Sequence, residues 1–244
     1  MNEGGHRLTS ISDRQLLQLQ ANALFTHDGR GRIRDVNEPD GDRAPRFFFA
    51  RSKEGNIWRC RDDVADETVR TLDALAAEEP IRDDLRAEPR NLDAFLAALR
   101  VDYESASIES GPAYYFPNEL PRPANVRLIT RADLHLLRVM VRDLDDTSRH
   151  FEEREPRMAI IEDNHVVSLC YSARLTDHAA GAGVETLDAY RGRGYAPAVV
   201  AAWARAIRTT GRIPLYSTSW DNLASQAVAR RLRLVQYGTD LSLG

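Results

Sequence analysis

The sequence predicts an α+β protein built around a mostly antiparallel sheet flanked by helices. Short apolar runs are joined by tight turns at residues 29–31, 54–56 and 163–164, a pattern typical of hairpins and hence of antiparallel strands. Between these runs lie segments with apolar residues at helical spacing, some of them followed by proline or glycine. Helices and hairpins in this mixture favour a sheet with helices packed on its faces.

The composition is that of a globular protein and excludes several functions. The 244 residues suffice for two domains, and 43% of them are hydrophobic and 29% charged. The net charge of −4 gives no basic excess of the kind that nucleic-acid binding needs. No apolar stretch is long enough to cross a membrane, and residues 1–15 lack the apolar core of a signal peptide. We expect no nucleic-acid partner and no membrane.

Cysteine and lysine usage bears on the cellular setting. Cys60 and Cys170 are far apart and lack metal-binding spacing, so we expect reduced thiols and no metal. Lys53 is the only lysine, which we attribute to the coding bias of a GC-rich genome. These features favour a bacterial, cytoplasmic protein.

Residues 1–120 are predicted to form a small α+β domain of unknown role. A helix is expected within residues 11–25, hairpins at 23–37 and 46–60, helices at 62–80 and 91–100, and extended chain at 104–117. We expect Asp62 or Asp63 to cap the helix at 62–80 and Pro80 to end it. The run Phe-Phe-Phe-Ala at residues 47–50 is expected in the core or at an interdomain contact.

Three prolines within residues 116–126 mark the predicted linker to a second domain, residues 121–244. Its expected elements are a strand at 126–130, a helix at 131–144, a hairpin at 157–175, a strand at 182–187, a helix at 194–211, a strand at 213–219, a helix at 222–234 and a strand at 234–243.

The segment Tyr-Arg-Gly-Arg-Gly-Tyr-Ala, residues 190–196, joins a strand to a helix. Pro197 falls in the first helical turn and Gly211 follows the last. The free backbone N–H groups near residues 193–196 therefore point out of a helix N-terminus and can bind an anion. A dinucleotide loop would need a third glycine where Pro197 stands, and a P-loop would need a lysine, so both are poor fits.

Residues 191–196 match the pattern R/Q-x-x-G-x-G/A, and residues 220–234 contain Asn-x-x-Ser at a helix start. Together these segments resemble the GCN5-related N-acetyltransferases, the GNAT superfamily. The resemblance extends over about residues 125–243 and is strongest over 183–234. It implies a GNAT-like central sheet that is mostly antiparallel and splayed, with an acyl-CoA thioester between the strands at 182–187 and 213–219.

The resemblance also implies a set of cosubstrate-binding residues for acetyl-CoA. Backbone N–H groups at the helix start would hold the pyrophosphate, a backbone N–H near Leu187 would stabilise the oxyanion, and Asn222 would contact the pantetheine arm or serve as a plain helix cap. The residues expected to bind the cosubstrate are Leu187, Arg191, Gly192, Arg193, Gly194, Tyr195, Ala196 and Asn222.

For catalysis we expect Glu185 to take the proton of the amine, since an acidic residue inside a strand is poorly placed for stability alone. A solvated strand face remains the alternative. Ser225 is a candidate acid, and Tyr216 and Tyr237 are the other available hydroxyl groups. Two positions depart from the family pattern: Ala229 stands where many members have a tyrosine, and Arg233 stands where a glycine is usual, so we expect a less regular turn there.

The resemblance implies an N-acetyltransferase that moves an acetyl group from acetyl-CoA to a primary amine of a small molecule or a protein, by direct attack in a ternary complex. The alternative is a non-catalytic acyl-CoA-binding sensor module, which Ala229 slightly favours. An NAD-linked enzyme is a third, weaker reading. Residues 1–120 would shape the acceptor side, and the oligomeric state is open, a homodimer being one alternative.

Overall fold

The computed structural model describes residues 11–100 and 107–244. The first part of the chain contains α1 (Asp13–Leu24), β1 (Phe25–His27), β2 (Ile33–Val36), β3 (Phe47–Ser52), β4 (Gly55–Cys60), α2 (Asp66–Ala77), α3 (Leu92–Arg100) and β5 (Ile108–Tyr115). Each of these elements lies within a segment where the sequence predicted it.

The second part contains β6 (Arg127–Ile129), the 3₁₀ helix η2 (Arg131–Leu137), α4 (Leu144–Arg149), the 3₁₀ helix η3 (Glu152–Arg154), β7 (Arg157–Glu162), β8 (His165–Leu175), β9 (Ala179–Thr186), the 3₁₀ helix η4 (Asp188–Tyr190), α5 (Tyr195–Thr209), β10 (Ile213–Ser217), α6 (Leu223–Arg231) and β11 (Val235–Leu243). The predicted strands and the two long helices are confirmed, and the segment 131–144 is not.

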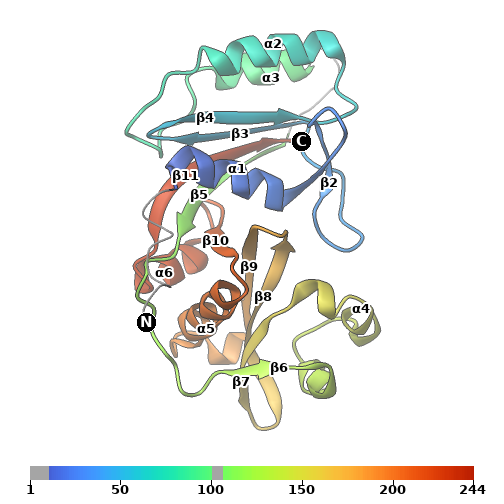
Figure 1. Cartoon of the computed structure of the whole chain (residues 1–244), viewed down its shortest axis with the longest axis vertical. Helices are drawn as coiled ribbons and strands as arrows, with labels where there is room; N and C mark the ends of the chain where they lie inside the picture. The colour runs from blue at the N-terminus through green and yellow to red at the C-terminus, as the bar shows by residue number, and fades with distance from the viewer. Residues whose placement is uncertain (1–10, 101–106) are drawn as a thin grey trace.

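Within the described residues, nine strands form one sheet in the order β4-β3-β11-β5-β10-β9-β8-β7-β6 (Figure 1). Neighbouring strands run antiparallel except β9 and β10, which are parallel. A separate two-stranded sheet is made by β1 and β2. The predicted class, α+β with a mostly antiparallel sheet flanked by helices, is confirmed.

Strands from both predicted domains pair within this sheet. β5, from before residue 120, lies between β10 and β11 and pairs antiparallel with both. β3 and β4 then extend the sheet beyond β11. The proline-rich residues 116–126 form no helix or strand, but Phe116 and Leu120 are buried against Trp203 and its neighbours. The boundary at residue 120 stays a prediction, within a sheet that is continuous across it.

The phenylalanine run in β3 lies in the core and packs helices on both faces of the sheet. Phe47 and Phe49 face Phe95 of α3, with ring centroids 5.0 and 5.2 Å away. Phe48 points to the opposite face, where it meets Phe25 at 5.2 Å in the cluster that includes α1. Because side chains alternate along a strand, three successive aromatic residues serve two separate clusters. Figure 1 shows α2 and α3 together beyond β3 and β4.

Two helix predictions are wrong: the cap of the helix at 62–80 and the extent of the helix at 131–144. α2 begins at Asp66 after Ala65, which makes no side-chain cap. Asp62 and Asp63 instead form ion pairs with Arg43 and Arg61. Segment 131–144 is no single helix: η2 ends at Leu137, and the Asp143 carboxylate accepts the N–H groups of residues 145 and 146 to start the short helix α4.

The turn after α6 is regular, contrary to the expectation from Arg233. Leu234 donates its N–H to the carbonyl of Ala229, and Arg233 donates to Arg230, which is the double hydrogen bond of a Schellman motif. Arg233 adopts φ +54°, the left-handed conformation that glycine tolerates and other residues strain to reach.

Arg233→Gly should therefore stabilise the fold by about 1 kcal/mol, because it relieves left-handed strain at an exposed position. Urea unfolding followed by circular dichroism measures this change. The control Arg230→Gly, in the last turn of α6, should destabilise the fold by a similar amount because glycine weakens a helix. Equal signs for the two variants would contradict the strain argument.

Asp240 in β11 is a carboxylic acid packed beside α1. Gln20 donates to its Oδ2 at 2.6 Å and accepts a hydrogen bond from the buried hydroxyl of Tyr237. Burial raises the pKa of Asp240 to about 7, and the charge of Glu109 adds to this shift. In the folded protein Asp240 therefore holds its proton over a pH range in which an unfolded chain would release it.

Because the pKa of Asp240 is higher in the folded protein than its unfolded value of 3.8, the free energy of unfolding depends on pH. The protonated carboxyl group costs the fold nothing at low pH, and the protein loses stability as pH rises towards 7. Asp240→Asn has no carboxyl group to ionise, so the variant should not lose this stability as pH rises. The variant should match the wild type near pH 4 and exceed it by on the order of 2 kcal/mol at pH 8. Thermal unfolding of both proteins from pH 4 to 8 measures the difference, and parallel curves would disprove the buried-acid assignment.

Candidate active site

A cleft of about 1110 Å³ opens where β9 and β10 separate. The two strands pair only between residues 213–215 and 179–181, so the rest of β9 has no partner on that side. The cleft is bounded by the second half of β9, the loop before α5, the end of β10 and the start of α6. A splayed pair of parallel strands therefore supplies a channel with main-chain edges along its wall.

The loop before α5 presents free backbone donors to this cleft. Gly192 and Gly194 adopt φ +79° and +80°, and Gly194 is the N-cap of α5. Among the residues that the structure describes, no protein acceptor pairs with the N–H groups of 192–196. A side chain at either glycine would meet open space, so the backbone itself faces the cavity. This is the geometry of an anion site at a helix N-terminus.

The arginine side chains of the loop are engaged elsewhere. Arg193 lies over the ring of Tyr190 at 4.8 Å, donates to the carbonyl of Ala189 at 3.2 Å, and is 3.6 Å from the carboxylate of Glu162. Arg191 forms an exposed ion pair with Asp188 at 2.9 Å. The uncommitted donors of the loop are thus main-chain groups, as the sequence suggested.

Most of the residues predicted from the sequence line this one cleft. They are Glu185, Arg191, Gly192, Arg193, Gly194, Tyr195, Ala196, Asn222 and Ser225. Leu187 is the exception: it does not line the cleft, and its N–H donates to the carbonyl of Val167 at 3.0 Å. It is therefore not a free oxyanion donor, and that expectation needs correction.

The free donors of β9 follow from strand alternation. In an antiparallel pair, the N–H and C=O groups of one residue face the partner strand and those of the next face away. Since Leu187 faces β8, Glu185 does too, and the main-chain groups of Val184 and Thr186 face the unpaired gap. Both residues line the cleft, so they replace Leu187 as candidate donors.

Glu185 is exposed on β9, on the sheet face opposite α5. The hydroxyl of Tyr171, in β8, donates to its Oε1 at 3.2 Å. Tyr171 lies over Gly183, where an added Cβ would come within 2.8 Å of the ring. Burial raises the pKa of Tyr171 and the charge of Glu185 raises it further, so the phenol stays protonated and able to donate. Sequence analysis missed Tyr171, which only the register of β8 against β9 identifies.

Two hydroxyl groups lie together on the β10 and α6 side of the cleft. Tyr216 of β10 and Ser225 of α6 have their oxygens 2.7 Å apart, and both residues line the cavity. Burial raises the pKa of Tyr216 to about 12. Asn222 accepts the N–H of Ser225 at 2.9 Å, so its predicted role as a helix cap is confirmed. Ala229, at the expected tyrosine position, is buried in the core.

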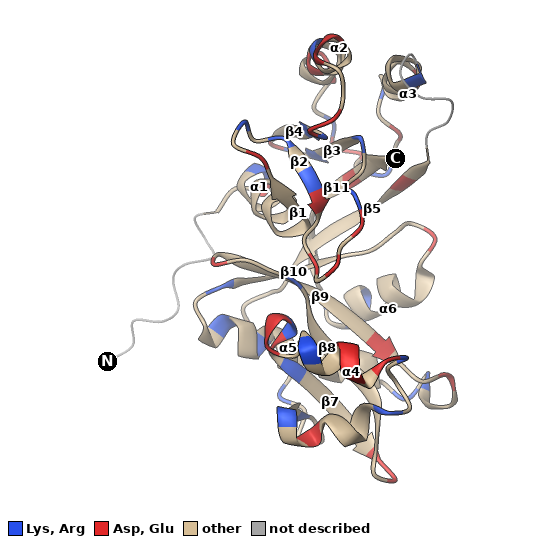
Figure 2. Cartoon of the chain, turned by 90° about the vertical axis from the view of Figure 1, so that its right-hand side faces the viewer, with Lys and Arg blue, Asp and Glu red and all other residues tan. Residues whose placement is uncertain are grey.

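Figure 2 shows basic and acidic positions interspersed along the described chain from end to end. No helix of the described part is long and apolar enough to span a bilayer.

Comparisons with known proteins bear on this geometry. Residues 122–237 match the family model described as GNAT acetyltransferase. No curated protein matches the chain. Among solved structures, an acetyltransferase of the GNAT family from Colwellia psychrerythraea is 12% identical, with a TM-score of 0.49, over 77% of this chain and 75% of that one.

Two further structures are similar in the same sense. A GCN5-related N-acetyltransferase-like protein from Streptococcus suis is 16% identical over 82% of this chain and 85% of its own, with a TM-score of 0.49. A GNAT-family protein from Novosphingobium aromaticivorans is 14% identical over 56% of this chain, with a TM-score of 0.44, and the match spans 64% of that chain, less than two thirds of its length. The assignment rests on the family model, whose match contains the loop, the cleft and β9, and residues 122–237 of this chain therefore belong to the GNAT acetyltransferase family.

Proposed function

We propose that the protein is an N-acetyltransferase that moves the acetyl group of acetyl-CoA to a primary amine of a small molecule or a protein, in a ternary complex. The observation that carries this proposal is the common cleft: free N–H groups at the start of α5, the unpaired edge of β9 and the carboxylate of Glu185 all border it. Family membership of residues 122–237 supports the same reaction class.

The residues present suit each part of acetyl-CoA. The pyrophosphate carries negative charge, which the N–H groups of residues 193–196 and the dipole of α5 would bind. The pantetheine arm contains amide groups, which can pair with the edge of β9 as an added strand would. Asn222 at the start of α6 lies on the opposite wall, within reach of the same arm.

In the proposed reaction Glu185 accepts a proton from the substrate ammonium, directly or through water, and the neutral amine attacks the thioester carbonyl. The N–H groups of Val184 and Thr186 face the gap where the tetrahedral oxyanion would form. The nitrogen then releases its second proton to water, the C–S bond breaks, and CoA leaves as the thiolate. A thiolate leaves without much help, so the Tyr216–Ser225 pair needs only to donate a hydrogen bond to the sulfur. Holding both reactants in place supplies much of the rate.

The acceptor would approach the face of the sheet that carries Glu185. Here Glu38, from the predicted N-terminal domain, bridges Arg174 at 2.7 Å and Arg154 at 3.3 Å. Arg154 in turn lies over the ring of Tyr171 at 5.6 Å. The first part of the chain thus borders the predicted acceptor side, which supports a role in shaping it.

Glu185→Gln should lower turnover about 100-fold near neutral pH, the usual contribution of a general base. The deficit should shrink as pH rises, because the amine then loses its proton to solvent. Thiol release from acetyl-CoA, with a panel of primary amines and lysine peptides, measures both effects. Asp188→Asn, an exposed carboxylate beside the loop, is the matched control and should leave turnover unchanged.

The same assay tests the alternative of a non-catalytic sensor. Tight CoA binding by calorimetry, with no thiol release for any amine and no effect of Glu185→Gln, would exclude the enzyme and favour the sensor. A deficit in Glu185→Gln that stays constant up to pH 10 would exclude the base role while leaving the enzyme intact.

Gly194→Ala should weaken CoA binding by about tenfold, because alanine resists the left-handed N-cap conformation and the donors behind it would shift. Gly211→Ala, with φ +79° and open space at the other end of α5, introduces the same strain without touching the cleft. Calorimetric titration of CoA into both variants measures this, and equal losses in the two would argue against pyrophosphate binding at the loop.

A further inference from the structure

A pocket of about 430 Å³ adjoins the candidate active site. The β1–β2 hairpin and residues 43–45 line one side of it, and β11 and the start of β5 line the other. Ser217, Thr218 and Ser219, at the end of β10, line both this pocket and the cleft, so the two cavities meet there. An acceptor whose amine lies beside Glu185 can therefore extend into the pocket.

The floor of the pocket is a patch of side chains that converge on one face of the sheet. Asp240 and Ser242 are two residues apart in β11, and Ser242 pairs with Glu109 of β5, so all three point to the same side. This is the side of α1, which donates a hydrogen bond to Asp240. Glu185 points to the same side, because it shares the face of β9 with Ala179, which packs in the cluster of α1.

The two carboxylates of this floor have no cation beside them. Within the described residues, Glu109 and Asp240 form no ion pair, and the charges that shift the pKa of Asp240 include Glu109 and no cation. Two neighbouring carboxyl groups favour a ligand that brings donors or positive charge. Three arginines also line the pocket, but each already pairs with carboxylates outside the lining: Arg43 with Asp35 and Asp62, Arg61 with Asp63, and Arg174 with Glu38.

Hydroxyl groups are the other polar feature of the pocket. Ser107, Ser217 and Ser242 line it, and within the described chain their hydroxyls form no hydrogen bond. Ser107 pairs with Gly244 through both main-chain groups, which places it next to the Ser242–Glu109 pair on the same floor. A hydroxyl can donate or accept, whereas a carboxylate only accepts. The pocket therefore suits a ligand that carries many hydroxyl and ammonium groups.

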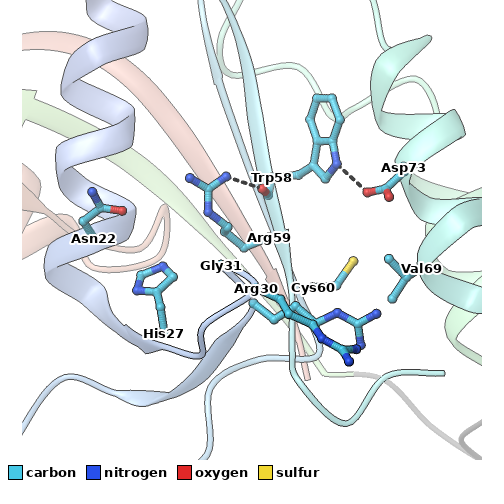
Figure 3. A pocket seen from close by; sticks show the side chains of 10 residues that line it. Asn22, His27, Arg30, Gly31, Trp58, Arg59, Cys60, Val69 and Asp73 are labelled. Atoms are coloured by element: carbon cyan, nitrogen blue, oxygen red, sulfur yellow. Dashed lines mark hydrogen bonds between the residues drawn. The ribbon is translucent and has the colours of Figure 1, made fainter. Parts of the chain in front are cut away.

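The groove at the edge strand β4 lacks such convergence (Figure 3). Trp58 and Arg59 lie on opposite sides of the strand, and the charge of Arg30 acts on Asp28 and Asp66. The groove also shares no residue with the cleft, whereas the pocket at β11 opens into it.

The sheet sets the distance between the pocket floor and the reacting groups. β5 and β10 lie between β11 and β9, so three strand spacings, about 14 Å in all, separate the strand of Asp240 from the strand of Glu185. Even with both side chains leaning inward, the gap exceeds one sugar ring and matches two linked rings. A volume of about 430 Å³ is also within the range of pockets that bind small molecules.

We propose that the acceptor is an amino sugar of two or more linked rings, with its reacting amine at Glu185 and the hydroxyl and ammonium groups of a second ring held by Glu109, Asp240 and Ser242. This assignment rests on the proposed acetyl transfer and names its substrate class. Glu109 and Asp240 position the acceptor and do not touch the reacting atoms. A linear polyamine would match the carboxylates but leave the serine hydroxyls without partners.

The probes are glucosamine and its β-1,4-linked disaccharide, compared with propylamine, spermidine and a lysine peptide. Thiol release from acetyl-CoA by the full chain gives kcat and KM for each. The disaccharide should exceed every other probe in kcat/KM at least about tenfold, because it alone reaches both the cleft and the hydroxyl-rich floor.

Glu109→Gln and Asp240→Asn should each raise KM for the disaccharide about tenfold and leave kcat unchanged, since each weakens a charge-assisted contact away from the reacting atoms. Neither should alter turnover of propylamine, which is too short to reach the pocket. Glu119→Gln, an exposed residue outside both cavities, removes the same charge and should change nothing.

An unchanged KM for the disaccharide in Glu109→Gln would overturn the proposal, as would a higher kcat/KM for spermidine or the lysine peptide. Should no amine be turned over, the acetyl-transfer proposal falls, and calorimetric titration of the disaccharide into the CoA-loaded chain still decides the pocket. Glu109→Gln should then weaken binding about tenfold and Glu119→Gln should not. No binding of the disaccharide at millimolar concentration would count against the pocket itself.

Discussion

The short parallel pairing between β9 and β10 is the contact on which the rest of the site depends. The two strands share only the register of residues 213–215 with 179–181 before they diverge. Beyond this point β9 keeps β8 on one side and has nothing on the other, so its polar main-chain groups must find a ligand or water. The same divergence places the start of α5 at the mouth of the gap. The divergence of these two strands thus leaves the N–H groups at the start of α5 and one edge of β9 without protein partners in the described chain.

The divergence is stable because β10 is held on its other side. β5 pairs with β10 and with β11, so the strand next to the gap is fixed by antiparallel hydrogen bonds rather than by its parallel neighbour. Gly111 in β5 lies so close to Thr218 that a Cβ would come within 1.7 Å of its carbonyl, which shows how tightly this part of the chain is packed. A segment that resembles no family motif therefore carries the mechanical support of the cleft.

Local sequence patterns predicted the helices and strands, whereas the pairing of strands that are distant in sequence determines which groups meet in the candidate site. Asp163 and Asn164 both adopt left-handed conformations, so the turn chemistry predicted the β7–β8 hairpin correctly. The loop that ends at Gly194 and begins α5 was likewise predicted from the sequence. The sequence did not predict the contact of Tyr171 with Glu185 or the hydrogen bond of the Leu187 N–H. Both depend on the register of β8 against β9, and a shift of one residue would point these groups the other way. Asp62 was a candidate helix cap and pairs with Arg43 instead, because an aspartate can do either and only tertiary contacts decide which.

The dependence of the cleft on β5 gives the N-terminal half a physical role. Without the N-terminal half, β10 and β11 would lose their pairing with β5 and expose hydrogen-bonding edges. Leu241 and Leu243 would also lose their contacts with the aromatic cluster around Phe47 and Phe95. Glu38 reaches from the same half to Arg154 and Arg174 on the face that carries Glu185. The family segment, residues 122–237, therefore contains the residues that line the cleft, while β5, which holds β10 in place, comes from outside it.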